Sequence, residues 1–563
     1  MLSDLKDLAL ALLDPASLDL KSLDLKALGL GVLGAFLVGR LVVLLIKPSA
    51  GPLPPGPKPA PLIGNLHQMP KSLQWLHLYH WSRDHYGPIM HMSMGGQPLI
   101  ILSSHQVAHD LLNRRSSRYS DRPRMVMSGE LVTKGMHMLL RQYDERYRLH
   151  QRMEAPLLNI RSAASYRPLQ DIESQQLLWD VLNEWEEFGE KGVDFHHHFE
   201  RAMASTIYCL NYGYRLKTGY EKELMDGKRV QAEFARTGEV GAYIVDSFPK
   251  LNYLPKFLAP WKKEAEELYE LERQLHVGNL HKGRASKGWN FTKFMDKSSE
   301  AKEMGEEELA FDLGILADAG LDTSTVALSW FIVAWITSGH TWVKRAQALL
   351  DEVVGKDRLP TFEDRPNLPF IDAIASETLR WRPVVVGGVP HFTKVEDTYM
   401  GYRIPANSIV LPNAFAITRD ESVFGADPNT FNPDRWMAEN PPETPNIDAC
   451  GFNVSALKDL PHTGFGFGRR ICTGRIIARN QLFIQMARML WAFDVEPGVV
   501  GENGERHKVD DMDCTEGFVT VPKPFRAVMR PRGEWVKEVI RERGTTHGID
   551  HSEIMDKASR DRA

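Results

Sequence analysis

Apolar residues recur three or four positions apart over much of the chain, most regularly between residues 140 and 350, which is the spacing of one helix face. The pattern predicts helices over residues 74–85, 168–188, 200–213, 222–238 and 475–493. Residues 306–337 are apolar on nearly all sides, which predicts a buried helix. Asp312, Asp318 and Asp322 lie within it and argue against a membrane span.

Strand-like alternation is limited to short segments. Residues 89–94 and 98–102, joined around Gly95 and Gly96, predict a β-hairpin. Between residues 384 and 470 short apolar runs alternate with Pro and Gly, which favours turns and few strands. The chain shows no repeat of fixed period and no long flexible linker after residue 60, so we expect a mainly α fold with a small β region.

The N-terminal segment has the composition of a membrane anchor. Residues 27–46 are apolar except for Arg40, and a helix of this length rises about 30 Å, the thickness of the hydrocarbon core. Aspartates prevail before this run, whereas Lys47 and Lys58 follow it, which favours a cytosolic C-terminal side. A cleaved signal peptide or a buried helix is the alternative, but the run lacks a charged n-region and a clear cleavage site.

Three further segments lie outside the expected globular body. Leucines in residues 1–26 recur in an amphipathic manner interrupted by Pro15, as they do in interfacial helices. Prolines crowd residues 47–61, which predicts an extended, stiff hinge. Residues 536–563 are mostly polar and charged, and we expect a mobile tail there.

Charge and cysteine content exclude several functions. A net charge of −5 and a pI near 6.5 provide no basic field for nucleic acid. The four cysteines form no C-x-x-C pair, so neither a structural zinc site nor a disulfide framework is expected, and so few thiols suit a reducing compartment. The adjacent histidines His196, His197 and His198 cannot all face one metal ion from a helix.

One cysteine stands in a distinctive setting. Residues 465–474 read Phe-Gly-Phe-Gly-Arg-Arg-Ile-Cys-Thr-Gly, and a predicted helix follows. Glycines allow close approach of the backbone, and a helix N-terminus with nearby arginines stabilises the thiolate of Cys472. By these properties alone, a reactive thiolate and an inert thiol in a glycine-rich turn remain equally open interpretations.

A family resemblance decides between them. Phe465, Gly468, Arg470, Cys472 and Gly474 match, position for position, the haem-binding signature of the cytochromes P450. The resemblance implies that Cys472 ligates the iron of haem b and that Arg470 pairs with a haem propionate. Thiolate ligation favours cleavage of the O–O bond.

The resemblance extends into the long predicted helix. Residues 319–323, Ala-Gly-Leu-Asp-Thr, look like the oxygen-activation motif of the family. Gly320 would then leave room for O₂, Thr323 would hydrogen-bond the bound oxygen, and Asp322 would relay protons. Without the resemblance, Gly beside Asp-Thr in a helix is more often a matter of packing and local hydrogen bonds.

Further positions match the haem surroundings in this family. His391 stands where the family places a propionate-binding residue. The helix near residue 147 departs from the pattern, because Tyr147 and Gln151 replace the usual Trp and Arg. Tyr147 can still donate a hydrogen bond. Arg148 and Arg152 lie beside these positions, and we include Arg152 among the expected cofactor-binding residues, with the replacement for the missing arginine left open.

A buried ion-pair network is also implied by the resemblance. Glu377 and Arg380 lie three residues apart on a predicted helix, and Arg435 comes from the later segment Phe431–Trp436. We expect these three residues to form a structural triad, since a buried charge is tolerated only with partners.

The substrate side is expected to be apolar. By analogy with the family, the pocket draws on residues 125–140, 311–320, 384–389 and 515–518. An apolar lining with few anchors suits a lipophilic small molecule. The candidate polar anchors are Ser128, Thr515 and Glu516.

The resemblance implies a haem-thiolate monooxygenase that receives electrons from an NADPH-dependent reductase and oxidises a lipophilic small molecule, such as an aromatic or polyketide secondary metabolite. Oxidation without oxygen insertion and a non-catalytic haem sensor are the alternatives. We expect the endoplasmic reticulum membrane as location, with the catalytic domain in the cytosol and no nucleic-acid partner. The expected parts are a segment at 1–26, an anchor at 27–46, a hinge at 47–61, a catalytic domain at 62–535 and a tail at 536–563.

Overall fold

The computed structural model describes residues 51–239, 241–442, 444–501 and 503–562. The expected segment 1–26, the anchor 27–46 and the start of the hinge lie outside these residues. Residues 51–53 and 398–403 form one small unit, within which the Arg403 N–H donates to the Pro52 carbonyl at 2.8 Å. The other described residues form the main unit.

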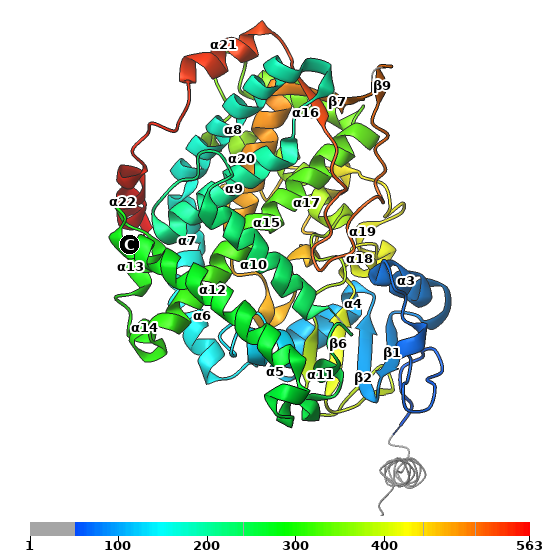
Figure 1. Cartoon of the computed structure of the whole chain (residues 1–563). Helices are drawn as coiled ribbons and strands as arrows, with labels where there is room; N and C mark the ends of the chain where they lie inside the picture. Colours follow the sequence, from blue (N-terminus) through cyan, green and yellow to red (C-terminus); the bar gives the residue numbers. More distant parts are fainter. Residues whose placement is uncertain (1–50, 240, 443, 502, 563) are drawn as a thin grey trace, which may run out of the picture. The chain divides into compact units, whose positions relative to one another are not determined.

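Helices make up most of the main unit (Figure 1). The α-helices are α3 (Gln74–Trp81), α4 (His105–Ala108), α5 (Ser116–Tyr119), α6 (Glu145–Leu158), α7 (Ile160–Ser165), α8 (Arg167–Phe188), α9 (Phe195–Tyr212), α10 (Lys222–Gly238), α11 (Ile244–Ser247), α12 (Pro260–Ala285), α13 (Phe291–Met295), α14 (Ser299–Met304), α15 (Glu306–Ser338), α16 (Trp342–Val353), α17 (Pro369–Trp381), α18 (Ala414–Ile417), α19 (Glu421–Phe424), α20 (Arg475–Ala492), α21 (Glu534–Arg543) and α22 (His551–Arg562). All the helices predicted from the apolar spacing are therefore confirmed to within a few residues.

The long helix α15 forms the centre of the core. It packs against α9 and α12, and Trp330 from α15 meets Trp381 from α17 edge to face at 6.1 Å. Of the helices in the described part of the chain, α15 is the one long and apolar enough to cross a membrane, but 72% of its apolar window is buried inside the protein. It is a core helix, as predicted.

The strands are few and short. They are β1 (Ile89–Met94), β2 (Gln97–Leu102), β3 (His391–Thr393), β4 (Asp397–Tyr399), β5 (Tyr402–Ile404), β6 (Ser408–Pro412), β7 (Phe493–Pro497), β8 (Val499–Val500), β9 (Glu505–Arg506) and β10 (Ala527–Pro531). The main sheet has the order β1-β2-β6-β3. The predicted hairpin is confirmed, with Ile89 opposite Leu102, and β6 joins β2 in parallel.

The end of the chain is folded, contrary to the expectation of a mobile tail. Residues 534–543 and 551–562 form α21 and α22, and α22 lies against α7 (Figure 1). Met555 and Ala558 are buried although most of their neighbours are charged. The prediction was wrong because it relied on the overall polarity of the segment. Two apolar residues three positions apart share one face of a helix, and they are enough for a short helix to pack against the protein.

Candidate functional site

A tight turn before α20 presents Cys472. The Cys472 N–H donates to the carbonyl of Phe465 at 2.8 Å. Gly468 has a φ of +56°, and a Cβ at this position would lie 2.0 Å from the carbonyl oxygen of Leu112, so both conformation and space require glycine. Gly474 is the N-cap of α20, so the cysteine stands just before a helix N-terminus.

The thiol of Cys472 is accessible, whereas the other three cysteines are buried. Protein atoms nevertheless enclose the site, and this burial raises the pKa of the Cys472 thiol, while the N–H groups of Gly474 and Arg475 and the positive charge of Arg475 act in the opposite direction. A bound metal ion would add the positive charge that a thiolate needs here.

The side chain of Arg470 extends from this turn toward α6. Its Nε donates to the Ser120 carbonyl at 2.7 Å, and a terminal nitrogen donates to the Arg141 carbonyl at 2.5 Å. Its guanidinium carbon lies 3.8 Å from the centroid of the Tyr147 ring. The structure thus brings the predicted residues Arg470 and Tyr147 together.

A second arginine joins them that the sequence did not reveal. Arg122 is buried and donates to the carbonyls of Leu139, at 3.0 Å, and Pro390, at 2.6 Å. His391 is the next residue, and its Nδ1 lies 2.7 Å from the Tyr119 carbonyl oxygen. No spacing or motif marks Arg122, which comes from a loop far from the other members in sequence.

This basic group carries positive charge that no ion pair in the described part of the chain balances, although Asp121, which pairs with Lys394 at 2.9 Å, acts on Arg470 through its charge. Within the described residues, neither Arg122 nor Arg470 forms an ion pair with a carboxylate. Burial and the nearby charge of Arg470 lower the pKa of Arg122 to about 9, and burial and the charge of Arg122 lower that of His391 to about 3. An anionic ligand with carboxylates at its edge would relieve this repulsion.

Arg152 does not belong to this group, contrary to the prediction. Its side chain is 52% exposed and pairs with Glu145 at 3.3 Å on the outer face of α6. Tyr147 and Arg152 are five residues apart, so they point in different directions on a helix. Arg122, and not Arg152, is the second arginine near Arg470 and Tyr147.

The predicted residues of α15 divide between two faces of the helix. Thr323 Oγ1 donates to the Ala319 carbonyl at 2.8 Å, and Ala319 is exposed between partly buried neighbours in the middle of this mainly buried helix. Asp322 is largely enclosed, and burial together with the charge of Glu200 raises the pKa of Asp322 to about 6. This carboxyl can therefore exchange a proton near neutral pH.

Gly320 faces the protein interior, which corrects its predicted role. A Cβ at Gly320 would lie 2.8 Å from Cγ1 of Ile207 on α9. The next residue along a helix points about 100° away, so Gly320 cannot share the accessible face of Ala319 and Thr323. Its missing side chain lets two helices approach and makes no room for O₂.

The expected triad is present behind the cysteine turn. Arg380 donates to both oxygens of Glu377, at 2.7 and 2.8 Å, and Arg435 Nε lies 3.6 Å from the same carboxylate. Trp436 Nε1 and the Asn432 N–H also donate to Glu377, at 2.9 and 2.8 Å. These bonds compensate the buried charge, which supports a structural role.

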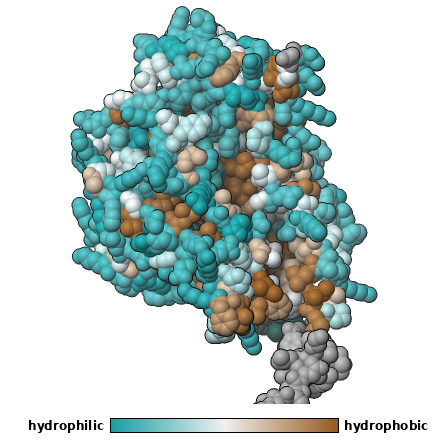
Figure 2. All heavy atoms as spheres, in the orientation of Figure 1, coloured by the Kyte–Doolittle hydropathy of each residue, from teal (hydrophilic) through white to brown (hydrophobic). Residues whose placement is uncertain are grey.

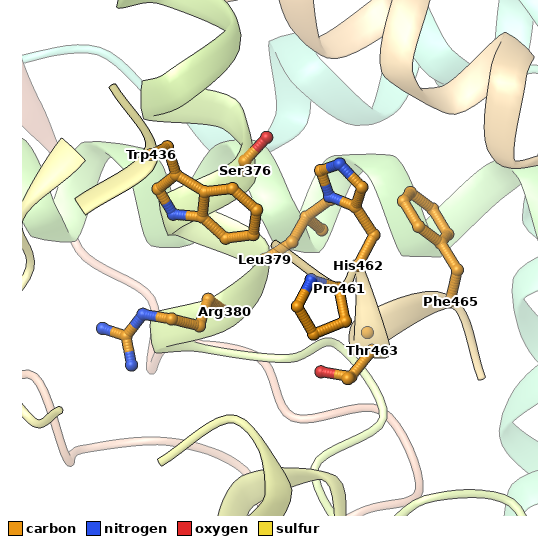
Figure 3. Close-up of a pocket in the computed structure, with 9 residues that line it drawn as sticks. Ser376, Leu379, Arg380, Trp436, Pro461, His462, Thr463 and Phe465 are labelled. Atoms are coloured by element: carbon orange, nitrogen blue, oxygen red, sulfur yellow. The ribbon is translucent and has the colours of Figure 1, made fainter. Parts of the chain in front are cut away.

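A small hollow lies beside this triad (Figure 3). Its walls are α17, Trp436 and the segment Pro461–Phe465, and the rings of Trp436 and His462 stack at 5.0 Å. The predicted residue Phe465 therefore lines this hollow with its ring, while its carbonyl holds Cys472.

The predicted substrate anchors are not equivalent. Ser128 is buried, Glu516 is exposed, and the hydroxyl of Thr515 accepts from the Val521 N–H at 3.0 Å within its own turn. One residue of the expected lining segment 125–140 forms a pair that the sequence did not suggest: the ring of His137 stacks on that of Phe234 from α10 at 4.4 Å.

The three adjacent histidines point to different partners, as predicted. His196 meets Ser329 at 3.0 Å, His197 meets the Thr218 carbonyl at 3.0 Å, and His198 pairs with Glu184. Across the described ranges, no group of three or more His, Cys, Asp or Glu residues could hold a metal ion.

Comparison with known proteins identifies the family. The cytochrome P450 family model matches residues 54–529. The chain is 40% identical over 507 residues to cytochrome P450 monooxygenase aneD of Aspergillus aculeatus, covering 90% of this chain and 93% of that protein. It is 35% identical to cytochrome P450 monooxygenase FrzL of Cladobotryum sp, covering 91% and 93%, and 33% identical to cytochrome P450 monooxygenase peniB of Penicillium patulum, covering 90% of each.

The chain belongs to the cytochrome P450 family and is an enzyme of its monooxygenase class. The site fits the haem of this family. Cys472, an exposed cysteine, would offer its thiol to the iron, and the positively charged Arg122 and Arg470 would pair with the two propionates, whose negative charge would also favour protonation of His391. The family match ends at residue 529, so α21 and α22 lie beyond it.

Proposed function

We propose that the protein binds haem b through Cys472 and uses O₂ and reductase-supplied electrons from NADPH to oxidise a lipophilic small molecule of fungal secondary metabolism. The observation that carries the proposal is the joint presence of an accessible cysteine in a glycine-constrained turn and a buried basic group with no carboxylate partner. Bound through a thiolate, haem supplies O₂ activation and O–O bond cleavage.

The residues of this chain would hold the group and deliver protons. Arg122, Arg470 and His391 would bind the propionates, and Tyr147 would keep Arg470 in place. Thr323 would offer its hydroxyl to the oxygen ligand, and Asp322 would reload it with protons. Asp322 is under the influence of Glu200, which pairs at 2.8 Å with Lys228, and this half-exposed lysine offers a link to solvent.

The substrate class is inferred from the residues that we expect to line the pocket. Residues of α15, the 384–389 segment and the 125–140 segment are mostly apolar, which suits a lipophilic molecule. The stacked pair of His137 and Phe234 adds a flat surface, and aromatic surfaces stack well on flat rings. We therefore favour an aromatic or polyketide-derived substrate, in keeping with the fungal relatives.

We also propose attachment to the endoplasmic reticulum membrane with the catalytic domain in the cytosol. The composition of residues 27–46 supports this. Around α11 and the loop after it, Phe248, Tyr253 and Phe257 are exposed, Tyr253 by 89%. Figure 2 shows apolar atoms gathered at the lower edge of this face, where Figure 1 places α11. Aromatic residues of this kind suit a lipid interface.

The first test is spectroscopic. The purified chain, reduced and exposed to carbon monoxide, should show the strongly red-shifted Soret band of thiolate-ligated haem. Cys472→Ala should lose this band, whereas Cys514→Ala, a matched substitution of a buried cysteine, should keep it. A red-shifted band in the Cys472 variant would overturn the assignment.

Turnover distinguishes the alternatives. In an assay under ¹⁸O₂ with NADPH and a microsomal reductase, a monooxygenase consumes NADPH and releases a product that carries one ¹⁸O atom. An oxidised product without ¹⁸O would indicate coupling or desaturation. Haem binding without NADPH consumption for any of a panel of fungal aromatic polyketides would favour the sensor.

A further inference from the structure

A buried histidine joins α6 to α15 beside the proposed haem site. His150 on α6 is fully buried, and its two ring nitrogens meet two carboxylates of α15. Nδ1 lies 2.5 Å from Oδ1 of Asp312, and Nε2 lies 2.8 Å from Oε1 of Glu308. An imidazole donates from both nitrogens only when it is protonated, so the ring is held as a cation between two acids.

We infer that His150 is a positioning residue that holds α6 against α15 and thereby keeps Tyr147 and Arg470 in place for the propionates. The inference rests on the proposed function, because it assigns a role toward the same haem site. It concerns no group that would touch the haem.

The contact of His150 with Glu308 and Asp312, called the joint below, fixes one relative position of α6 and α15 because of the spacing of the two carboxylates. Glu308 and Asp312 are four residues apart, so they lie one above the other on a single face of α15. One ring inserted between them fixes the helix at two points, and both the rotation and the sliding of α6 along α15 are restricted. A single ion pair would fix one point only.

Other charged groups complete the joint. Arg146 donates from Nε to both oxygens of Glu308, at 3.0 and 3.1 Å, and Arg141 lies 3.2 Å from the same carboxylate. Glu154, one turn after His150, is buried beside Asp312, and burial with that neighbouring charge raises the pKa of Glu154 well above its usual range. Burial opposes the charge of His150, but its two carboxylates prevail and raise its pKa to about 9.

The joint lies between two functional elements. Tyr147 precedes His150 by three residues on α6, so both point inward from neighbouring turns, and Tyr147 packs on Arg470. Asp312 precedes Asp322 on α15 by ten residues, fewer than three turns.

A general stabilising role is the competing explanation. A buried ion pair can often be exchanged for apolar residues without loss of stability, so stability alone would not require this arrangement. The experiment must therefore separate haem placement from folding.

We would measure haem dissociation into excess apomyoglobin, the melting temperature and the Soret band of the reduced carbon monoxide complex for His150→Leu. The matched control is His198→Leu, which removes a partly buried histidine from its glutamate, Glu184, between α8 and α9. Both variants should melt lower than the parent by about 5 °C or more. Only His150→Leu should release haem at least tenfold faster at 25 °C and lose part of the red-shifted band.

Parent-like haem release and spectrum in a folded His150→Leu variant would overturn the inference. If that variant does not fold, Asp312→Asn replaces it, because the amide keeps the shape and removes one charge. It should release haem about threefold faster, and an unchanged rate would equally overturn the inference. A parent protein that binds no haem, or shows no red-shifted band, would instead refute the proposed function itself.

Discussion

The guanidinium of Arg470 lies over the ring of Tyr147, with 3.8 Å between the guanidinium carbon and the ring centroid. Tyr147 is buried, so the contact is shielded from water, and a desolvated contact of this kind is stronger than an exposed one. An aromatic ring at residue 147 therefore serves the basic group even though the family usually has tryptophan there.

We expect Tyr147→Leu to weaken haem binding about fivefold, since a cation–π contact of about 1 kcal/mol is lost. Tyr147→Phe should keep most of the affinity because the ring remains, and Tyr147→Trp should match or exceed the parent. Titration of the apoprotein with haem measures the three affinities. Arg152→Leu is the control on the same helix, and its affinity should not change because this arginine is exposed. Equal affinities for Leu and Phe at residue 147 would show that the ring has no such role.

The contact between Gly320 and Ile207 leads to a second prediction. A methyl group at Gly320 would stand 2.8 Å from Cγ1 of Ile207, closer than carbon atoms normally pack. Gly320→Ala should therefore destabilise the fold by about 1–3 kcal/mol, and Ile207→Ala should recover part of this loss in the double variant. Chemical denaturation of the single and double variants measures the coupling.

A glycine in open space provides the comparison. No atom lies within 4 Å of a Cβ at Gly278 on α12, so Gly278→Ala should stabilise the protein by about 0.5–1 kcal/mol through helix propensity alone. If Gly320→Ala behaved like Gly278→Ala and instead altered O₂ binding, the original interpretation of Gly320 would regain support.

Sequence analysis predicted those parts of the site that lie close together in the chain. The turn from Phe465 to Gly474 and the helix around Thr323 depend on local spacing, and the structure has a turn and a helix at these residues. Arg122 could not be predicted, because its partners Pro390 and Arg470 lie hundreds of residues away and only the tertiary fold brings them together. Gly320 was misassigned because a motif shows which residues share a helix but not which neighbour each face meets.

Titration of buried groups should place the stability maximum on the acid side of neutrality. Burial raises the pKa of Glu272 from 4.5 to about 8, and two carboxylates raise that of His150 from 6.5 to about 9. The folded state therefore binds more protons than the unfolded state above pH 6.5, and stability falls as the pH rises. Below pH 6.5, buried neutral histidines such as His276, whose pKa burial lowers to about 4, act in the opposite sense.

Glu272→Gln tests this assignment. The amide cannot ionise, so the variant should lose less stability between pH 6.5 and 8 than the parent, by up to about 2 kcal/mol. Urea denaturation at a series of pH values measures the slope. The control is Glu266→Gln on the same helix, where the carboxylate is exposed and pairs with Lys256. The same slope for the parent and Glu272→Gln would mean that Glu272 is ionised in the folded protein.

The folded C-terminal segment gives the last prediction. Arg215 donates to the carbonyl of Thr546, at 2.6 Å, and to its hydroxyl, at 2.9 Å, and the Trp289 N–H donates to Asp556 at 2.8 Å. Deletion of residues 545–563 removes these bonds and exposes the surface under Met555, whose burial alone is worth about 2 kcal/mol. We expect the melting temperature to fall by about 5–10 °C.

This deletion should leave haem affinity unchanged at 25 °C, because α22 packs mainly on α7 and α8, and neither of these helices carries a residue that we propose to hold haem. Met555→Asp in the full-length chain should reproduce the loss of stability, since it places a charge in the buried face of α22. An unaltered melting temperature in both variants would mean that α22 contributes no stability in solution. A selective loss of haem would show instead that this segment, which lies beyond the family match, supports the site through α7 and α8.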